Sequence, residues 1–307
     1  MFLPGSDHLR RQEQLGKKIC EKTRKQKRKC IELIIKEFGK RYINKLKVSE
    51  IEKYLFDDED HSGSWKNSFL ECFAAIYEET IWKCSKPIPK PFFQKFSRNS
   101  NKADVFTTEE LMRLFDFKYW KNYDIQYFLM FLCCISCGLR LGEAIGLKPQ
   151  QFLFDQKVLV VDGFIRYDNT RTNYNKTGSE NEKKWRAVPL PDTTSQFLKN
   201  YITNMHIKDN DLIFKINRKP LRQDNSRKVF YKVLENCGIE KKNRKLVPHS
   251  LRYTYITKMR RYCTLEDVQK IAGHSNVQMT EYYTRVVINE LIANIQSTIP
   301  AANKLFL

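Results

Sequence analysis

The sequence predicts a mainly α-helical protein that carries a small β-sheet and folds as two domains. Three observations lead to this fold class. Most of the chain has apolar residues at helical spacing, the β-branched runs fall between residues 157 and 191, and a proline-rich basic stretch separates two helical regions. A chain of 307 residues, 41% of them hydrophobic, can bury a sizeable core in at least one of two domains.

Several helices are expected in an N-terminal domain over residues 1–86. Residues 17–38 begin strongly basic and become amphipathic, as in a helix that packs one face on a core. A second helix is expected to begin at Ser49, whose hydroxyl would cap the first turn. Residues 64–84 follow an acidic, glycine-containing turn and predict a long, well-packed helix.

A linker is expected over residues 87–105. Pro87, Pro89 and Pro91 fall within five positions and cannot continue a helix, because proline lacks the backbone N–H and clashes with the preceding turn. The polar and basic residues that follow them favour an extended chain. We therefore expect this segment to join the two domains.

The second domain is expected over residues 106–307 and opens with a clear helix start. Thr107 and Glu110 have the spacing of a capping box, in which each side chain accepts a bond from the other's backbone N–H. Phe106 and Leu111 are placed to pack against each other across this start.

The core of the second domain is expected to be a helix over residues 124–137, which is apolar on all sides. Gly138 is expected to end it, and residues 140–147 to begin a short second helix. Cys134 and Cys137 lie in the apolar stretch, where cysteine behaves as a small buried hydrophobe, so we expect no zinc site there.

The rest of this domain is expected to combine a small sheet with further helices. The strands are expected at residues 157–161, 164–168 and 185–191. The last two strands flank a long polar loop, residues 169–184. Helices are expected from Thr194 onward, one of them with a Thr264–Asp267 capping box and Gly273 as its stop.

The chain is strongly basic, with a formal net charge of +20. Residues 1–102 hold 23 lysines and arginines against 14 acidic residues, a net of +9 that leaves +11 for the rest. A surplus in both domains favours a polyanionic partner, with nucleic acid ahead of a membrane surface. The alternative is a generally lysine-rich protein from an AT-rich genome, which its abundant Ile, Asn and Tyr also fit.

The sequence also favours a cytoplasmic location. No stretch approaches about 18 consecutive apolar residues, the length that a membrane span needs. The N-terminus lacks the apolar core of a signal peptide. Nine cysteines, an odd number, fit reduced thiols better than a disulfide framework.

Four short stretches carry side chains that suit phosphoryl transfer: GLRLGE, NKTG, HSLRYT and GHSNVQMTEYYTRV. Two arginines can grip phosphate oxygens, two histidines can move protons, a lysine can protonate a leaving oxygen, and a tyrosine can attack phosphorus. These residues are Arg140, Lys176, His249, Arg252, His274 and Tyr283. No carboxylate cluster that could hold two Mg²⁺ accompanies them, so we expect neither a metal nor another cofactor.

Taken singly, these residues have ordinary explanations. Arg140 could form a helix-end ion pair with Glu143, for which we expect only a structural role. His249 could stand at a helix start, and His274 could cap a helix end. Tyr283 could lie in a core. Their occurrence together, in one order along the chain, favours a shared site.

In this order and spacing, the six residues resemble the active site of the tyrosine recombinase (phage integrase) family. GLRLGE resembles the family's first arginine box, HSLRYT its second, and GHSNVQMTEYYTRV its GH box and nucleophile helix. The resemblance spans residues 106–290, and residues 17–83 resemble more weakly the family's core-binding domain. It implies a helical core DNA-binding domain joined to a mixed α/β tyrosine-recombinase catalytic domain.

The resemblance implies how the DNA strand would be cut. Tyr283 would attack the scissile phosphate and leave a 3′-phosphotyrosyl link and a free 5′-hydroxyl. Arg140 and Arg252 would stabilise the charge on the non-bridging oxygens. Two positions depart from the pattern: Tyr253 stands where the family more often has histidine, and Tyr282 adjoins the expected nucleophile.

The three remaining residues would move protons or hold phosphate oxygens, again by resemblance. Lys176 would protonate the departing 5′-oxygen, since NKTG best matches the family's hairpin. The loop is long and rich in lysine, so Lys183 or Lys184 could take this role instead. His249 would assist proton transfer, and His274 would hold a phosphate oxygen.

The implied function is site-specific recombination of double-stranded DNA by a mobile-element integrase or transposase, with four protomers acting as a homotetramer. A type IB topoisomerase, which shares the chemistry but relaxes one duplex as a monomer, remains an alternative. A C-terminal segment that exchanges between protomers would favour the recombinase, and residues 288–307 could form one. A non-catalytic DNA-binding regulator on the same fold is the other alternative, against which the six intact positions argue.

Overall fold

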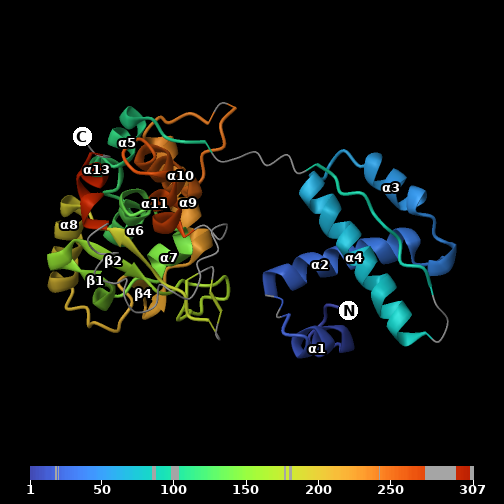
Figure 1. The fold of residues 1–307 in the computed structure, drawn as a ribbon. Coiled ribbons are helices and arrows are strands. Elements are labelled where there is room, and N and C mark those ends of the chain that lie inside the picture. The colour runs from blue at the N-terminus through green and yellow to red at the C-terminus, as the bar shows by residue number, and fades with distance from the viewer. Residues whose placement is uncertain are drawn as a thin grey trace. The chain divides into compact units, whose positions relative to one another are not determined.

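The computed structural model divides the chain into two compact units, Met1–Asn101 and Lys102–Leu307 (Figure 1). The described residues are 1–17, 19, 21–84, 88–97, 104–175, 178–179, 182–241, 243–273 and 295–304. Within them the secondary structure is mainly helical with two small antiparallel sheets, which confirms the predicted fold class. The domain limits expected from the sequence, 1–86, 87–105 and 106–307, stay predictions.

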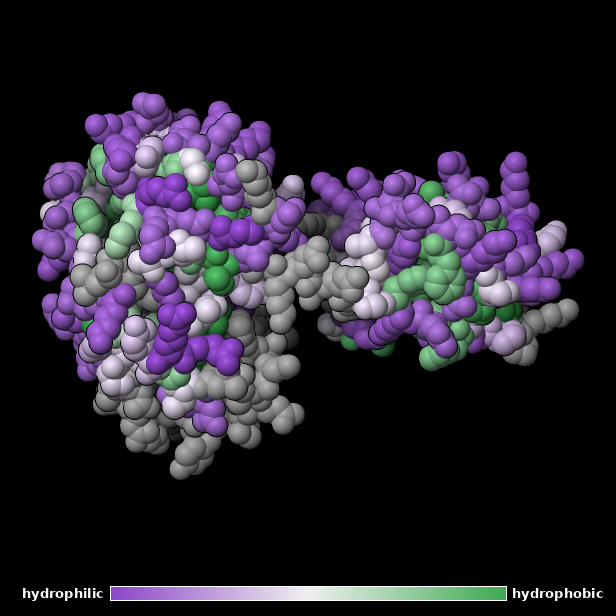
Figure 2. Space-filling model, turned by 90° about the horizontal axis from the view of Figure 1, so that it is seen from above, coloured by the Kyte–Doolittle hydropathy of each residue, from purple (hydrophilic) through white to green (hydrophobic). Residues whose placement is uncertain are grey.

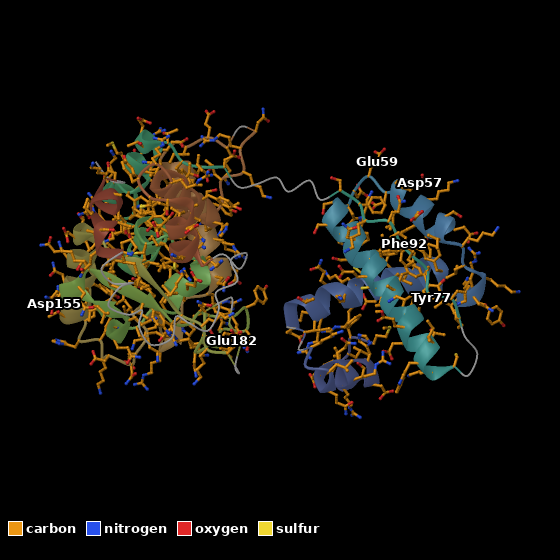
Figure 3. All side chains as sticks on the ribbon, in the orientation of Figure 1. Asp57, Glu59, Tyr77, Phe92, Asp155 and Glu182 are labelled. Atoms are coloured by element: carbon orange, nitrogen blue, oxygen red, sulfur yellow. The ribbon has the colours of Figure 1, made fainter. Side chains whose placement is uncertain are left out.

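The first unit is a group of helices around an aromatic core. Its elements are α1 (Asp7–Gln14), α2 (Glu21–Phe38), the 3₁₀ turn η1 (Ile43–Lys45), α3 (Val48–Phe56) and α4 (Gly63–Lys83). Helix α2 packs against α4, and the ring of Phe73 contacts those of Phe38 and Phe69. Tyr77 of α4 (Figure 3) donates its hydroxyl hydrogen to the Ile43 carbonyl at 3.0 Å, and this bond fixes η1 on the core.

Two helix starts in this unit are capped differently. Before α4, the Ser62 hydroxyl accepts the N–H of Trp65 at 3.4 Å. The expected cap of α3 by Ser49 is wrong, because that helix begins one residue before Ser49. The Glu50 carboxylate accepts the N–H of Lys47 at 3.0 Å, and this local bond places the helix start ahead of the serine.

An extended segment, residues 88–97, lies against the first unit. The side-chain amide of Asn67 in α4 donates to the Phe96 carbonyl and accepts the Phe96 N–H, both at 2.9 Å. Phe93 and Phe96 also pack against the core, whereas Phe92 is 84% exposed (Figure 3). Part of the stretch expected to be a linker is therefore bonded to the first unit.

The second unit is built around α6 (Ile125–Ser136), the apolar helix expected at its core. The other helices and 3₁₀ turns within its described residues are α5 (Thr108–Leu114), η2 (Phe117–Tyr119), α7 (Leu141–Ile145), η3 (Pro149–Gln151), η4 (Phe154–Gln156), α8 (Asp192–Asn204), α9 (Gln223–Asn236), α10 (Pro248–Met259), α11 (Leu265–Ala272) and α13 (Ile299–Asn303). Helix α6 contacts α7, α8 and α10. It ends where Gly138 adopts a left-handed conformation, as expected. Cys134 and Cys137 are fully buried, and burial raises the pKa of both thiols.

A three-stranded antiparallel sheet lies beside these helices, in the order β1 (Phe152–Leu153), β2 (Val158–Val161), β3 (Arg186–Pro189). A two-stranded sheet joins β4 (Lys215–Ile216) to β5 (Lys219–Pro220). The expected strands 157–161 and 185–191 are confirmed, and Val161 pairs with Arg186. The expected strand 164–168 is wrong: only Ile165 forms a bridge, because the chain turns back immediately after it.

The two expected capping boxes of the second unit differ in their hydrogen bonds. The Thr107 hydroxyl accepts the Glu110 N–H at 3.1 Å, and the Glu110 carboxylate accepts the Thr107 N–H at 2.9 Å. At α11, the Thr264 hydroxyl accepts the Asp267 N–H at 3.2 Å and donates to the Asp267 carboxylate at 2.6 Å. Gly273 follows α11 with a positive φ, as expected of its stop.

Residues 295–304 pack on the second unit. Ile295 shares a small buried cluster with Val158 of β2. At the start of α8, the Asp192 N–H donates to the side chain of Asn303 at 3.2 Å. This stretch therefore covers β2 and the start of α8 within its own unit.

The surface of both units is mostly hydrophilic in the view of Figure 2. Apolar side chains show through as scattered patches on each unit. Among the helices of the described chain, none combines the length and apolar character that a membrane span would need.

Candidate active site

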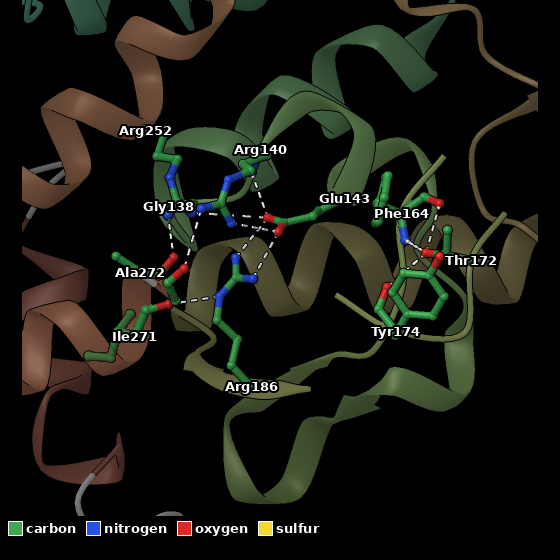
Figure 4. A network of polar contacts seen from close by, with 11 residues as sticks. Gly138, Arg140, Glu143, Phe164, Thr172, Tyr174, Arg186, Arg252, Ile271 and Ala272 are labelled. Carbon is green, nitrogen blue, oxygen red and sulfur yellow. Dashed lines mark hydrogen bonds and ion pairs between the residues drawn. The ribbon is translucent and has the colours of Figure 1, made fainter. Parts of the chain in front are cut away.

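Glu143 lies at the centre of a buried polar network (Figure 4). It sits in the first turn of α7, and its side chain has no exposed surface. Arg140, the residue just before α7, donates its backbone N–H to Oε2 at 2.8 Å and its Nη1 to Oε1 at 2.9 Å. Arg140 therefore forms the helix-end ion pair with Glu143 that its ordinary explanation expects, and both residues also belong to a larger cluster.

Arg186, at the start of β3, binds the same carboxylate from the other side. Its Nη1 donates to Oε1 of Glu143 at 2.9 Å, and its Nη2 donates to Oε2 at 2.7 Å. Its Nε donates to the carbonyl of Ile271 at 2.8 Å. The Arg186 side chain is 6% exposed, so a buried guanidinium fork meets a buried carboxylate in the bidentate geometry that such pairs favour.

Arg252 enters the cluster from α10. Its side chain is 1% exposed, and its two terminal nitrogens donate to the carbonyls of Gly138 and Ala272. Its Nη1 lies 4.0 Å from Oε2 of Glu143, close enough for attraction but too far for a hydrogen bond. Burial, with the nearby charges of Arg140 and Arg186, lowers the pKa of Arg252 to about 9.

The three arginines also hold the end of α11. Arg186 and Arg252 bind the carbonyls of Ile271 and Ala272, and Nη2 of Arg140 lies 3.4 Å from the Gly273 carbonyl that follows. The last carbonyls of a helix have no partner within it and carry the negative end of its dipole, so cations are favoured there. The chain is therefore fixed immediately before His274 in the sequence.

The cluster carries an excess of positive charge. Burial alone would raise the pKa of Glu143, but the charge and hydrogen bonds of Arg186, with the charges of Arg140 and Arg252, hold it well below its ordinary value. The carboxylate is thus ionised, and three guanidinium groups face one negative charge. Arg140 is the most accessible of the three, with a side chain that is 20% exposed. Such a cluster can bind an anion that approaches from the Arg140 side.

His249 lies on α10, the same helix as Arg252, one turn nearer its start. Its ring is exposed at the surface and packs edge-on against Tyr253, with the ring centroids 5.0 Å apart. The structure thus brings Arg140 and Arg252 into one cluster and puts His249 on the helix that carries Arg252. Three expected site residues, Lys176, His274 and Tyr283, lie outside the described residues, and so does Tyr282.

The loop that carries Lys176 in the sequence is described at its base. The Asn175 N–H donates to the Lys184 carbonyl at 2.7 Å, and the Gly178 N–H donates to the Asn175 carbonyl at 3.0 Å. The two alternative lysines, Lys183 and Lys184, are exposed, and Lys184 forms an ion pair with Glu182 at 2.9 Å.

Sequence reasoning missed Arg186 as a site residue and treated it as part of a strand. The available signal was an arginine at the start of an apolar run, WRAVPLP, where every strand residue proves to be buried. A buried cation needs an ionised partner, so such a position predicts a carboxylate nearby. Without the fold, the choice among the many acidic residues of the chain could not be made.

This arrangement coincides with a known domain. Residues 104–290, more than half of the chain, match the model of the phage integrase family. The chain belongs to this family. The match includes all six residues by which the sequence resembles tyrosine recombinases, and it confirms that resemblance.

Curated relatives of this family member are named tyrosine recombinases. A tyrosine recombinase of Pseudothermotoga lettingae is 26% identical over 226 residues, which cover 73% of this chain and 70% of the relative. The tyrosine recombinase XerA of Pyrococcus furiosus is 27% identical over 164 residues, 53% of this chain and 51% of the relative. The chain thus spans about half the length of the archaeal relative that it matches. It is a tyrosine recombinase by family and by these relatives.

Solved structures share the fold of this tyrosine recombinase. An integrase of the transposon Tn1549, in complex with a circular intermediate DNA, superposes with a TM-score of 0.69 at 17% identity, over 94% of this chain and 98% of that one. A lambda integrase fragment, solved as a dimer bound to a COC′ core site, gives 0.63 at 14% identity, over 89% and 96%. At such identities these structures establish the fold, and both were solved with DNA bound.

Proposed function

We propose that this tyrosine recombinase is the integrase or transposase of a mobile element, and that its arginine cluster binds the scissile phosphate of double-stranded DNA. One observation carries the proposal: Arg140, Arg186 and Arg252 converge on a single buried carboxylate. Two positive charges are left over, which suits the charge that develops on a phosphate during transfer. The structural neighbours that were solved with a circular intermediate DNA and with a COC′ core site support the choice of DNA.

The proposed cut conserves the phosphodiester energy. The phenolic oxygen of Tyr283 attacks phosphorus, the bond from phosphorus to the 5′-oxygen breaks, and a 3′-phosphotyrosyl link and a 5′-hydroxyl result. Arg140 and Arg252 stabilise the charge on the non-bridging oxygens in the transition state. Attack by a 5′-hydroxyl on the protein link reverses the step, so strand exchange needs no ATP.

Protons move through residues around this cluster in the proposal. Lys176 protonates the leaving 5′-oxygen, His249 assists proton transfer, and His274 holds a phosphate oxygen. His249 has support from its helix, because α10 also carries Arg252. His274 has support from the sequence position directly after Gly273, whose carbonyl lies near Arg140. Lys176 has support from a loop whose base joins Asn175 to Lys184, at the entry to β3.

We further propose that residues 1–86 form a core DNA-binding domain, 87–105 a linker, and 106–307 the catalytic domain. Helix α2 of the first unit gives support, because Lys25 and Lys29 are exposed on it. Arg24 and Arg28 share the carboxylate of Glu21 at 2.6 and 3.0 Å, so that part of the basic run is partly neutralised. Four copies acting as a homotetramer, in the cytoplasm where their DNA would lie, complete the proposal.

Covalent capture tests this function. A pool of nicked duplexes with a randomised core is incubated with the protein, and DNA that survives denaturation on the protein is recovered and sequenced. The proposal expects a recovered core sequence and, with two labelled intact duplexes of that sequence, exchange of strands between them. Relaxation of supercoiled DNA without exchange would support the topoisomerase alternative, and DNA binding without any covalent product would support the non-catalytic regulator.

A further inference from the structure

An acidic residue at the centre of a phosphate-binding cluster calls for a physical reason. A carboxylate repels a phosphate, and within a poorly solvated cluster that repulsion is stronger than in water. Glu143 is ionised and fully buried, directly between Arg140 and Arg186 (Figure 4). Its negative charge must be offset by one of the neighbouring guanidinium groups if the cluster is to favour an anion.

The hydrogen bonds show which group offsets it. A carboxylate has about four lone-pair positions. Arg186 fills one position on each oxygen with two terminal N–H groups, at 2.9 and 2.7 Å. Arg140 fills the other two, but only one of these bonds uses its guanidinium, because the second comes from its backbone N–H. Arg252 has no hydrogen bond to the carboxylate and lies 4.0 Å away.

We propose that Arg186 is a positioning residue whose charge is committed to Glu143, so that Arg140 and Arg252 keep their own charges for the DNA phosphate. The inference rests on the proposed function of the cluster. Without Arg186, Oε1 and Oε2 would each lose a donor, and Arg252, whose Nη1 lies 4.0 Å from Oε2, is a cation close enough to replace it. Arg252 would then be drawn toward the carboxylate and away from the phosphate.

Arg186 has a second contact that a test must separate from this charge effect. Its Nε binds the Ile271 carbonyl at 2.8 Å, and a Cβ at Gly273 would lie 3.0 Å from its Cδ. The same side chain therefore also fixes the end of α11, which directly precedes His274. A variant without Arg186 would lose both the counter-charge and the tether, and only the charge can be restored by changing Glu143.

The test compares Arg186→Met with the charge-balanced double variant Arg186→Met/Glu143→Gln. Each variant is incubated at saturating concentration with the nicked duplex recovered for the wild-type protein, and the rate of covalent complex formation is measured. Arg186→Met, with one excess positive charge, should be slower by about 10²–10³-fold, comparable to losing one preorganised donor. The double variant again has two excess positive charges and should react at least about tenfold faster than Arg186→Met. Its DNA affinity should stay close to that of the wild type.

A conservative variant and a matched control complete the design. Arg186→Lys keeps the counter-charge but loses the fork and the bond to Ile271, so it should react faster than Arg186→Met. Arg244 makes a similar bidentate pair with Glu110, at 2.6 and 3.0 Å, outside the cluster. Arg244→Met should keep the wild-type rate at a temperature where circular dichroism shows each variant to be folded.

The outcomes separate the inference from the function on which it rests. A wild-type protein that forms no covalent complex would overturn both. A wild-type protein that reacts, with Arg186→Met equally fast, would overturn the inference alone. The inference would also be overturned if the double variant and Arg186→Lys were both as slow as Arg186→Met, because Arg186 would then act only as a tether of α11.

Discussion

At the scale of single residues, the positive charge of Arg252 costs free energy, because the side chain is buried beside two other cations. Burial and the charges of Arg140 and Arg186 lower its pKa to about 9, which still leaves it protonated near neutral pH. The same surroundings would lower the pKa of a lysine at this position below its ordinary value of about 10.4. Arginine is therefore the side chain that can stay charged in this cluster.

We predict that Arg252→Lys gives a recombinase whose rate of covalent complex formation, divided by the wild-type rate, falls as the pH rises from about 6 to about 8. The amine is protonated below its pKa and loses its charge above it, whereas Arg252 keeps its charge over this range. Dividing by the wild-type rate cancels the part of the pH dependence that both proteins share. A ratio that is constant between pH 6 and 8 would contradict a charge-dependent role for Arg252.

Lys176 should act on the leaving group and leave DNA binding unchanged. Lys176→Ala is expected to slow cleavage of ordinary DNA by about 10²–10⁴-fold, the usual contribution of a general acid. A 5′-bridging phosphorothiolate leaves without a proton, so the variant should regain most of its rate on that substrate. Arg140→Ala should not be rescued in this way, because Arg140 stabilises the non-bridging oxygens.

The lysines of the same loop provide the matched controls. Lys184 is exposed and paired with Glu182, and Lys183 is exposed beside it. Rescue of Lys183→Ala or Lys184→Ala by the phosphorothiolate, with none for Lys176→Ala, would assign the leaving-group proton to a different lysine.

At the scale of elements, the end of α11 depends on Gly273. This residue has φ +63, and a Cβ there would lie 3.0 Å from Cδ of Arg186. Gly273→Ala should lower the free energy of unfolding by about 1–2 kcal/mol for the left-handed conformation alone, with a further loss from the contact with Arg186. It should also slow covalent complex formation, because the end of α11 would shift.

Gly238→Ala is the control for backbone strain. Gly238 has φ +64 and nothing within 4 Å of an added Cβ, so its substitution measures the left-handed conformation without the contact. Thermal or urea unfolding compares the two variants. If both variants lost the same free energy of unfolding and both formed the covalent complex at the wild-type rate, the close approach of Gly273 to Arg186 would contribute to neither quantity.

Elements whose signals are local could be predicted from the sequence. Thr107 and Glu110 cap α5 through neighbours three residues away, and the apolar run of α6 marks it as the core. Ser49 misled because Glu50, also close in sequence, forms the competing cap. Residues 164–168 have the composition of a strand, but the chain turns back after Ile165 and leaves only a bridge.

The site could be predicted only in part, because some of its residues stand in local motifs and others act through contacts that are distant in the sequence. Arg140 and Arg252 stand in motifs with family-specific spacing, so the sequence alone could propose both as site residues. Arg186 acts through Glu143, 43 residues away, and through the end of α11, 85 residues away. Such contacts are set by tertiary structure, and no short pattern encodes them.

At the scale of the whole molecule, the charge surplus should control DNA binding. The net charge of +20 is spread over both parts of the chain, so several phosphates should be contacted and their counterions released. With about six such contacts, affinity should fall roughly 10³-fold between about 50 and 200 mM salt. Fluorescence anisotropy with a labelled duplex measures this dependence, and a flat response would indicate a partner other than nucleic acid.

For the whole molecule, we propose that this tyrosine recombinase cuts DNA through a tyrosine aligned with a phosphate held by arginines. Mass spectrometry of the covalent complex, formed on the recovered duplex in excess EDTA, tests it most directly. We predict a nucleotide attached to Tyr283, and loss of the complex but not of DNA binding in Tyr283→Phe. Attachment to Tyr282, or a complex that forms only when Mg²⁺ is restored, would contradict it.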